Sequence, residues 1–175
     1  MCGASANAWL YKTTVSCGRA ERHLNTPTRF DSGKQEYTWQ VNDLLNQVHP
    51  NLVIVEAADA IGGYDSPDLP KAWIYDQVHT LALKIQSANA SCVWVGPVYG
   101  DVNSVYRKAD DRVRGVSAFL SQSVAPCLYV DSLKFEPMAH WSTTDGQHLN
   151  DAGYRAWGVH IADAVIHFKP QNQLQ

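Results

Sequence analysis

The chain has 175 residues, which is enough for one domain but not comfortably for two. Hydrophobic residues make up 45% of it and charged residues 18%, which excludes a disordered or collagen-like chain. The net charge of −3 does not suit a surface that follows phosphates, so we expect no nucleic-acid partner. No apolar run approaches ~20 residues, so we expect no membrane span, and residues 1–10 do not resemble a signal peptide.

From residue 37 onward the hydrophobic pattern predicts helices alternating with strands. Apolar residues spaced three and four apart predict helices at 41–48, 74–85, 104–124 and 154–165. Short apolar runs predict strands at 52–55, 93–95 and 128–131, the first of them suited to burial on both faces. This alternation predicts a parallel sheet with helices on both faces. We expect a single α/β domain over 1–168 and a polar tail over 169–175.

Residues 1–36 show no clear period and add no strand to this predicted sheet. A sheet of only three parallel strands is small for the class. The predicted strand 52–55 would then present an unpaired apolar edge. We therefore expect an N-terminal segment or a second chain to cover that edge.

Four cysteines permit two disulfides, and their spacing excludes a zinc finger because there is no Cys-x-x-Cys motif. Cys2 and Cys17 bracket a short, loop-like stretch. Cys92 and Cys127 lie at the starts of two apolar runs, so they can bridge if those runs are neighbouring strands in register. The alternative is buried free thiols. Bridges would indicate an extracytoplasmic protein, periplasmic or secreted.

The most informative polar pair is Asp145 and His148, in the loop that precedes the last predicted helix. Ligands of open parallel sheets bind beyond the carboxyl ends of the strands, where this loop is expected to lie. In such a turn the carboxylate accepts the imidazole Nδ1–H, and the other nitrogen can take a proton from a hydroxyl nucleophile. The alternative is a surface Asp that caps a turn beside a packed His. No residue spacing indicates a metal site, and we expect no cofactor.

Residues 143–154, Thr-Thr-Asp-Gly-Gln-His-Leu-Asn-Asp-Ala-Gly-Tyr, resemble the last conserved block of the SGNH/GDSL hydrolase superfamily. The most specific feature is Asp-x-x-His followed by Asn-x-x-Gly-Tyr at a helix start. Residues 52–64 are similar to the block in which the family has an apolar strand ending in Gly-x-Asn. The resemblance covers residues 37–168 and implies a three-layer α/β/α domain. It also implies that Asp145 and His148 complete a Ser-His-Asp triad.

Two departures from the family pattern bear on function. The family's Asn donates a hydrogen bond into the oxyanion hole, but that position is Ala60 here, or Asp59 if the alignment shifts by one. Loss of one such donor costs about 100- to 1000-fold in rate. The nucleophile block, Gly-Asp-Ser in the family, has only Gly3-Ala4-Ser5 as a candidate, and no strand body precedes it.

A second assignment of the N-terminal residues fits better. Residues 2–18, with Cys2-Gly3 and Cys17-Gly18, resemble the second block of some extracytoplasmic members. This resemblance implies that Gly3 is a backbone donor to the oxyanion and that Cys2 and Cys17 form a disulfide. In this assignment the domain lacks its N-terminal strands and the nucleophilic Ser lies upstream of Met1. In the first assignment the domain is complete and Ser5 is the nucleophile.

The resemblance implies a serine esterase that hydrolyses acyl esters, such as O-acetyl esters, on a carbohydrate or cell-envelope glycan. His148 would be the general base and Asp145 its orienting partner. The alternative is a catalytically silent SGNH-like module or fragment that binds a glycan or a partner segment. Aromatic loop residues would then supply sugar-stacking surfaces: Tyr64, Trp73, Tyr99 and Trp141.

Overall fold

A computed structural model of the chain describes residues 3–15, 18–31, 36–135 and 141–167. Its centre is a parallel sheet in the order β5-β6-β7, formed by β5 (Leu52–Glu56), β6 (Ser91–Val95) and β7 (Leu128–Val130). The three predicted strands are therefore confirmed, each within one residue or two of its expected bounds. Val53 of β5 pairs with Cys92 of β6, and Val93 with Leu128 of β7.

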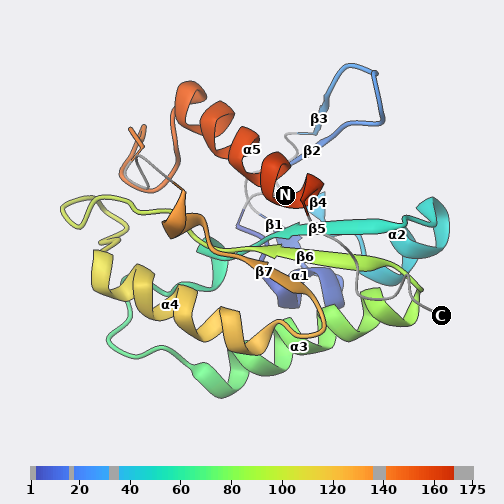
Figure 1. Cartoon of the computed structure of the whole chain (residues 1–175), viewed down its shortest axis with the longest axis horizontal. Coiled ribbons are helices and arrows are strands. Elements are labelled where there is room, and N and C mark those ends of the chain that lie inside the picture. Colours follow the sequence, from blue (N-terminus) through green and yellow to red (C-terminus); the bar gives the residue numbers. More distant parts are fainter. Residues whose placement is uncertain (1–2, 16–17, 32–35, 136–140, 168–175) are drawn as a thin grey trace.

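Helices cover both faces of this sheet (Figure 1). On one face lie α1 (Ala6–Leu10), α3 (Lys71–Ser87) and α4 (Asp110–Ser123), and on the other lies α5 (Asp151–Ile166). Successive side chains of a strand point to opposite faces. Accordingly, Trp94 of β6 belongs to the core beneath α3 and α4, and Val93 and Val95 belong to the core beneath α5. The predicted three-layer α/β/α domain is confirmed.

The strand β5 is less buried than its apolar sequence predicts. Val53 and Val55 pack against the α3-side core, but Leu52, Ile54 and Glu56 are exposed on the opposite face. The expectation of burial on both faces is wrong because the described part of the core beneath α5 draws its strand residues from β6 and β7. Helix α2 (Val41–Val48) has the bounds that the sequence predicts. It lies beside β5, at the end of the molecule opposite to α4 (Figure 1).

The predicted helix 104–124 begins only at Asp110, where α4 starts. Residues 99–109 form a loop instead. Asp101 organises this loop, since its side chain accepts the Asn103 N–H at 2.8 Å and its carbonyl accepts the Ser104 hydroxyl at 2.7 Å. Such side chain–backbone bonds compete with helix formation, and Arg107 has a left-handed φ of 50°.

The N-terminal part adds two small antiparallel pairs. β1 (Thr14–Val15) pairs with β4 (Glu36–Tyr37), and β2 (Arg19–Glu21) pairs with β3 (Arg29–Asp31). The β2–β3 hairpin extends away from the parallel sheet (Figure 1). In the described part of the chain, no helix has the length and apolar character needed to cross a membrane.

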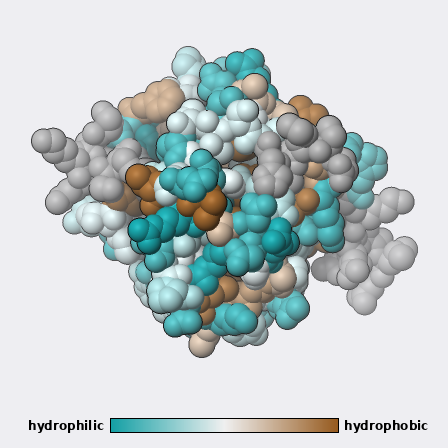
Figure 2. Space-filling view, turned by 90° about the vertical axis from the view of Figure 1, so that its left-hand side faces the viewer, coloured by the Kyte–Doolittle hydropathy of each residue, from teal (hydrophilic) through white to brown (hydrophobic). Residues whose placement is uncertain are grey.

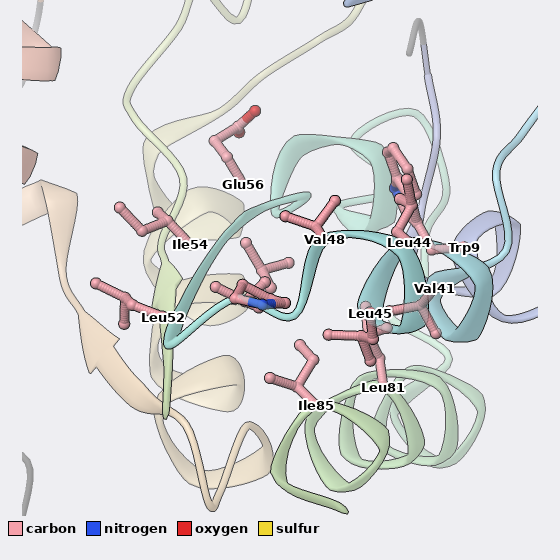
Figure 3. Close-up of a pocket in the computed structure, with 13 residues that line it drawn as sticks. Trp9, Val41, Leu44, Leu45, Val48, Leu52, Ile54, Glu56, Leu81 and Ile85 are labelled. Carbon is pink, nitrogen blue, oxygen red and sulfur yellow. The ribbon is translucent and has the colours of Figure 1, made fainter. Parts of the chain in front are cut away.

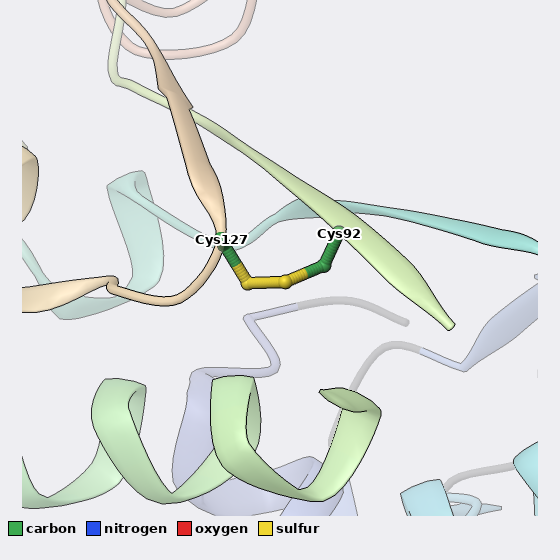
Figure 4. The surroundings of a disulfide bond; sticks show 2 residues. All are labelled: Cys92 and Cys127. Atoms are coloured by element: carbon green, nitrogen blue, oxygen red, sulfur yellow. A yellow bond between two sulfur atoms is a disulfide. The ribbon is translucent and has the colours of Figure 1, made fainter. Parts of the chain in front are cut away.

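A disulfide joins Cys92 in β6 to Cys127, the residue that precedes β7 (Figure 4). Both cysteines are buried in the core beneath α3. The sequence prediction for this pair is confirmed, because parallel pairing brings the starts of the two strands side by side. The second predicted pair, Cys2 and Cys17, lies outside the described residues.

Candidate functional site

The carboxyl ends of β5, β6 and β7 meet at the end of the molecule that carries the loops 99–109 and 141–150 (Figure 1). Viewed from this end, the surface is mostly hydrophilic with small hydrophobic patches (Figure 2). A pocket of about 240 Å³ opens here, as expected for a parallel α/β sheet. Its lining comes from residues near the N-terminus, the end of β5 and the residues after it, the loop after β6, and the loop and first turns of α5: Gly3, Ala4, Glu56, Ala57, Asp59, Ala60, Val98, Gln147, His148, Leu149, Tyr154 and Trp157.

Asp145 and His148 form the closely bonded pair that the sequence predicted. The His148 Nδ1 lies 2.7 Å from Asp145 Oδ2, and Asp145 Oδ1 accepts the His148 backbone N–H at 2.8 Å. Desolvation opposes the charge on Asp145, but the hydrogen bonds from His148 and the Gln147 N–H outweigh it and lower the Asp145 pKa to about 2. The carboxylate therefore holds Nδ1 as the protonated nitrogen, which leaves Nε2 free for proton transfer.

The loop that carries this pair is fixed at both ends. Thr143 and Leu149 form an antiparallel bridge, so the turn between them closes tightly. Gly146 within the turn has a φ of +87°, and a Cβ there would overlap Ser104. The Asn150 side chain then caps α5 by accepting the Gly153 N–H at 2.9 Å, which confirms the predicted Asn-x-x-Gly helix start.

His148 is positioned from the side by an aromatic ring. The ring of Tyr106, in the loop 99–109, meets the His148 ring edge-on, with centroids 5.7 Å apart and planes at 88°. The side chain of His148 is half exposed, so a ligand in the pocket has access to it. The pair is therefore ordered by protein contacts and open to solvent.

Asp59, the first residue of the short helix η1 (Asp59–Ile61), lines the pocket. A buried lysine balances its negative charge. The Asp59 Oδ1 lies 2.8 Å from Lys108 Nζ and accepts the Tyr64 hydroxyl at 2.8 Å. Burial and the Asp59 charge raise the Tyr64 pKa, so this hydroxyl remains a donor. Lys108 is fully buried, and its ammonium lies 5.2 Å from the centre of the Tyr64 ring. The repulsion expected between Asp59 and an oxyanion is thus offset by a buried cation.

Glu56 ends β5 at the rim of the same pocket. Desolvation of its carboxyl group, followed by the charge of Asp59, raises the Glu56 pKa to about 7, although the residue as a whole is exposed. Tyr154 faces this region from α5, and desolvation and the Glu56 charge raise its pKa. Near neutral pH the Glu56 carboxyl group is therefore partly protonated.

The structure brings together most of the residues predicted for the site. Gly3, Asp59, Ala60 and His148 all line the pocket, and Asp145 holds His148 from behind. Gly3 has a left-handed φ of 61° and open space around its Cα. Ser5 is not among the lining residues; it stands at the N-cap of α1, without a side-chain capping bond.

Sequence reasoning missed several residues of the site, among them Glu56, Lys108, Tyr106 and Tyr154. A carboxylate directly after an apolar strand run was a usable signal for Glu56, because strand ends face the ligand. Nothing in the sequence around Lys108 distinguishes it from a surface lysine. Among the described residues, no cluster of three or more His, Cys, Asp or Glu side chains is arranged to hold a metal ion.

No protein-family model matches the chain. Among curated proteins the chain is similar to Protein BcsX of Komagataeibacter xylinus, with 32% identity over 167 residues. The match covers 95% of this chain and 63% of BcsX, so the chain spans less than two thirds of that relative.

Two solved structures are similar in architecture. A Bacteroides fragilis protein described as an acylhydrolase superposes with a TM-score of 0.54 and 14% identity, over 71% of this chain and 65% of that one. A GDSL-like lipase of Bacteroides thetaiotaomicron superposes with a TM-score of 0.53 and 13% identity, over 71% and 66%. This chain has the fold of the GDSL-like acylhydrolases. At such low identity the likeness concerns the fold alone, so the activity must be argued from the site.

Proposed function

We propose that the protein hydrolyses acyl esters and that His148 is the general base of the reaction. The observation that carries the proposal is the 2.7 Å contact between Asp145 and His148, at the mouth of a pocket formed by strand ends. An oriented imidazole with one nitrogen free is the arrangement that activates a hydroxyl group for attack on a carbonyl carbon. The acylhydrolase fold supports the same chemistry.

The reaction requires two proton transfers through His148. Its Nε2 takes the proton of the attacking hydroxyl as the oxygen bonds to the acyl carbon, and the carbonyl oxygen becomes an oxyanion. The bond to the alcohol oxygen then breaks, and His148 returns the proton to that leaving group, which completes hydrolysis if the attacking hydroxyl belongs to water. If it belongs to a serine, the product is an acyl-enzyme, and a water molecule activated by His148 in the same way then releases the acid and restores the serine. The Gly3 backbone N–H is the proposed oxyanion donor, and the Lys108 charge beneath Asp59 keeps the surroundings from repelling the oxyanion.

The size of the pocket supports a short acyl group as substrate. Its volume of about 240 Å³ lies below the ~300–1,000 Å³ of pockets that enclose drug-sized ligands. An O-acetyl ester on a carbohydrate fits, since the acetyl group enters and the sugar remains outside. The disulfide between Cys92 and Cys127 supports an extracytoplasmic location, periplasmic or secreted, where cell-envelope glycans occur.

The attacking hydroxyl has three possible sources. Ser5 is the candidate within the chain, but the lining residues of the pocket include no serine. The alternative attacking groups are a serine on a segment that joins the site and a water molecule held by His148.

The same observation supports a second candidate function, a silent module that binds an acylated glycan without turnover. The aromatic residues expected to stack on sugars support it weakly. Tyr64 packs against the main core and Trp141 against the core beneath α5, and Tyr99 is half-buried. Trp73 on α3 is the exposed member of the four.

Labelling with a fluorophosphonate probe, followed by peptide mass spectrometry, tests the esterase directly. The proposal expects turnover of acetylated oligosaccharides, and any serine that is labelled should lose its label in His148→Ala. Label on Ser5 that depends on His148 would assign Ser5 as the nucleophile. Saturable binding of the oligosaccharides without turnover or label would favour the silent module instead.

A further inference from the structure

The described ionisable groups around the pocket that His148 lines carry a net negative charge. Asp59 and the buried Lys108 form an ion pair, so their charges cancel. Asp145 stays ionised beside the neutral imidazole of the base and contributes one negative charge, and Glu56 contributes a second when it is ionised. Of the described residues that line the pocket, none is Lys or Arg, so the lining favours a positively charged ligand.

The carboxyl group of Glu56 is available to such a ligand. Glu56 is exposed at the end of β5, where it lines both this pocket and a second, apolar opening of about 530 Å³ along the strand. Every other residue of the second opening is uncharged, and the Glu56 carboxyl group is directed away from the apolar side chains there, such as Leu81 and Ile85 (Figure 3). Within the described ranges, no group forms a hydrogen bond or an ion pair with this carboxyl group.

An exposed aromatic ring lies near this carboxyl group. Tyr154, in the first turns of α5, lines the same pocket and is 45% exposed. Desolvation, and after it the charge of Glu56, raises the Tyr154 pKa, so the two side chains are close enough to interact. A carboxylate binds an ammonium group through a charge-assisted hydrogen bond, and the face of an aromatic ring attracts the same cation. The two side chains together therefore suit a ligand that carries a protonated amine.

We propose that Glu56 selects a carbohydrate substrate with a free, protonated amine near the ester, that is, an amino sugar whose nitrogen is not acylated. This inference rests on the proposed function, in which the acetyl group enters the pocket and the sugar remains outside. The Glu56 carboxylate pairs with the ammonium group, and the ring of Tyr154 packs against the sugar. The amine belongs to the sugar and not to the acyl group, because Glu56 and Tyr154 are both exposed at the rim of the pocket.

Pairing between Glu56 and an ammonium group also favours the reaction itself. Hydrolysis creates an oxyanion in the pocket, and an ionised Glu56 opposes a further negative charge nearby. The ammonium group of an amino sugar cancels the Glu56 charge, so the oxyanion forms in less negative surroundings. A neutral sugar provides no such compensation. Glu56 therefore favours the amino sugar both in binding and in the transition state.

The test measures the affinity of the chain for three trisaccharides by calorimetric titration at pH 7. The first is the trimer of glucosamine, the second is its fully N-acetylated form, and the third is cellotriose, which has a hydroxyl group in place of each amine. Binding requires no turnover, so the result does not depend on ester hydrolysis. Glu56→Gln removes the charge and keeps the shape of the side chain, and Tyr154→Ala removes the ring. Glu21→Gln is the matched control, because Glu21 lies on β2, in the hairpin that extends away from the parallel sheet (Figure 1).

We expect the wild type to bind the glucosamine trimer about fivefold more tightly than the other two, as for one exposed charge pair. Glu56→Gln should abolish this preference, Glu21→Gln should keep it, and Tyr154→Ala should weaken the binding of all three trimers. The inference is overturned if the wild type binds none of them, binds the three equally, or shows a preference that persists in Glu56→Gln. The expected preference without hydrolysis of any acetyl ester would refute the proposed esterase and leave the selectivity of Glu56 standing.

Discussion

The Cys92–Cys127 disulfide allows the most quantitative prediction for this fold. It closes a loop across 35 residues of sequence, which contains the whole of α4. A cross-link across such a loop lowers the conformational entropy of the unfolded chain. In the chain-entropy treatment this stabilises the fold by about 4 kcal/mol. Domains of this size are stable by only about 5–15 kcal/mol, so reduction should remove a large part of the margin.

The assay compares urea unfolding with and without reductant in the wild type and in Cys92→Ala/Cys127→Ala. The double variant is the control for any other thiol of the chain. We expect reductant to lower the free energy of unfolding by about 4 kcal/mol more in the wild type than in the double variant. Equal losses in the two proteins would refute the assignment of the stabilisation to this loop.

Three further predictions concern the pocket. The Glu56 pKa is raised from 4.5 to about 7, so the folded state holds the proton more tightly than the unfolded chain. The stability of the wild type should therefore fall relative to Glu56→Gln as the pH rises from about 4.5 to about 7, by about 1 kcal/mol because Glu56 is exposed and screened by solvent, as measured by urea unfolding. Gly146→Ala should cost about 2 kcal/mol because its φ is positive and its Cβ would overlap Ser104, whereas Gly115→Ala on α4, where a Cβ meets nothing, should be neutral or stabilising by about 0.5–1 kcal/mol in thermal unfolding. Lys108→Met should destabilise by about 3 kcal/mol by leaving the Asp59 charge without its cation, and Asp59→Asn added to it should restore most of the loss; a double variant no more stable than the single one would contradict the ion pair.

The parts of the fold that the sequence predicts are those controlled by local periodicity. Strands 93–95 and 128–131 were found because their apolar runs are short and continuous, and their pairing correctly placed Cys92 beside Cys127. Periodicity placed the last helix at 154–165, whereas α5 begins at Asp151; the earlier start, with Asn150 as its cap, came from the resemblance to the family's Asn-x-x-Gly-Tyr pattern. Each of these features depends on residues close together in sequence.

The features that sequence analysis missed depend on tertiary contacts. An apolar run predicts a strand but not which of its faces a helix covers, so the exposure of Ile54 was unforeseen. Periodicity extended α4 back to residue 104, although the turn bonds of Asp101 and the left-handed Arg107 delay its start. Lys108 lies in that loop, and its burial against Asp59 comes from a contact between segments distant in sequence.

The central claim is that His148, held by Asp145, is the base of an ester-hydrolysing site. A second histidine–aspartate pair provides an internal control: His167 Nδ1 lies 3.4 Å from Asp163 at the exposed end of α5, outside the pocket. The decisive measurement is the rate of p-nitrophenyl acetate hydrolysis by the wild type, His148→Ala and His167→Ala, each shown to be folded. We predict a loss of about 100-fold or more in His148→Ala and an unchanged rate in His167→Ala. Equal rates in the two variants would contradict the claim, because the hydrolysis would then come from exposed imidazoles in general and not from this pocket.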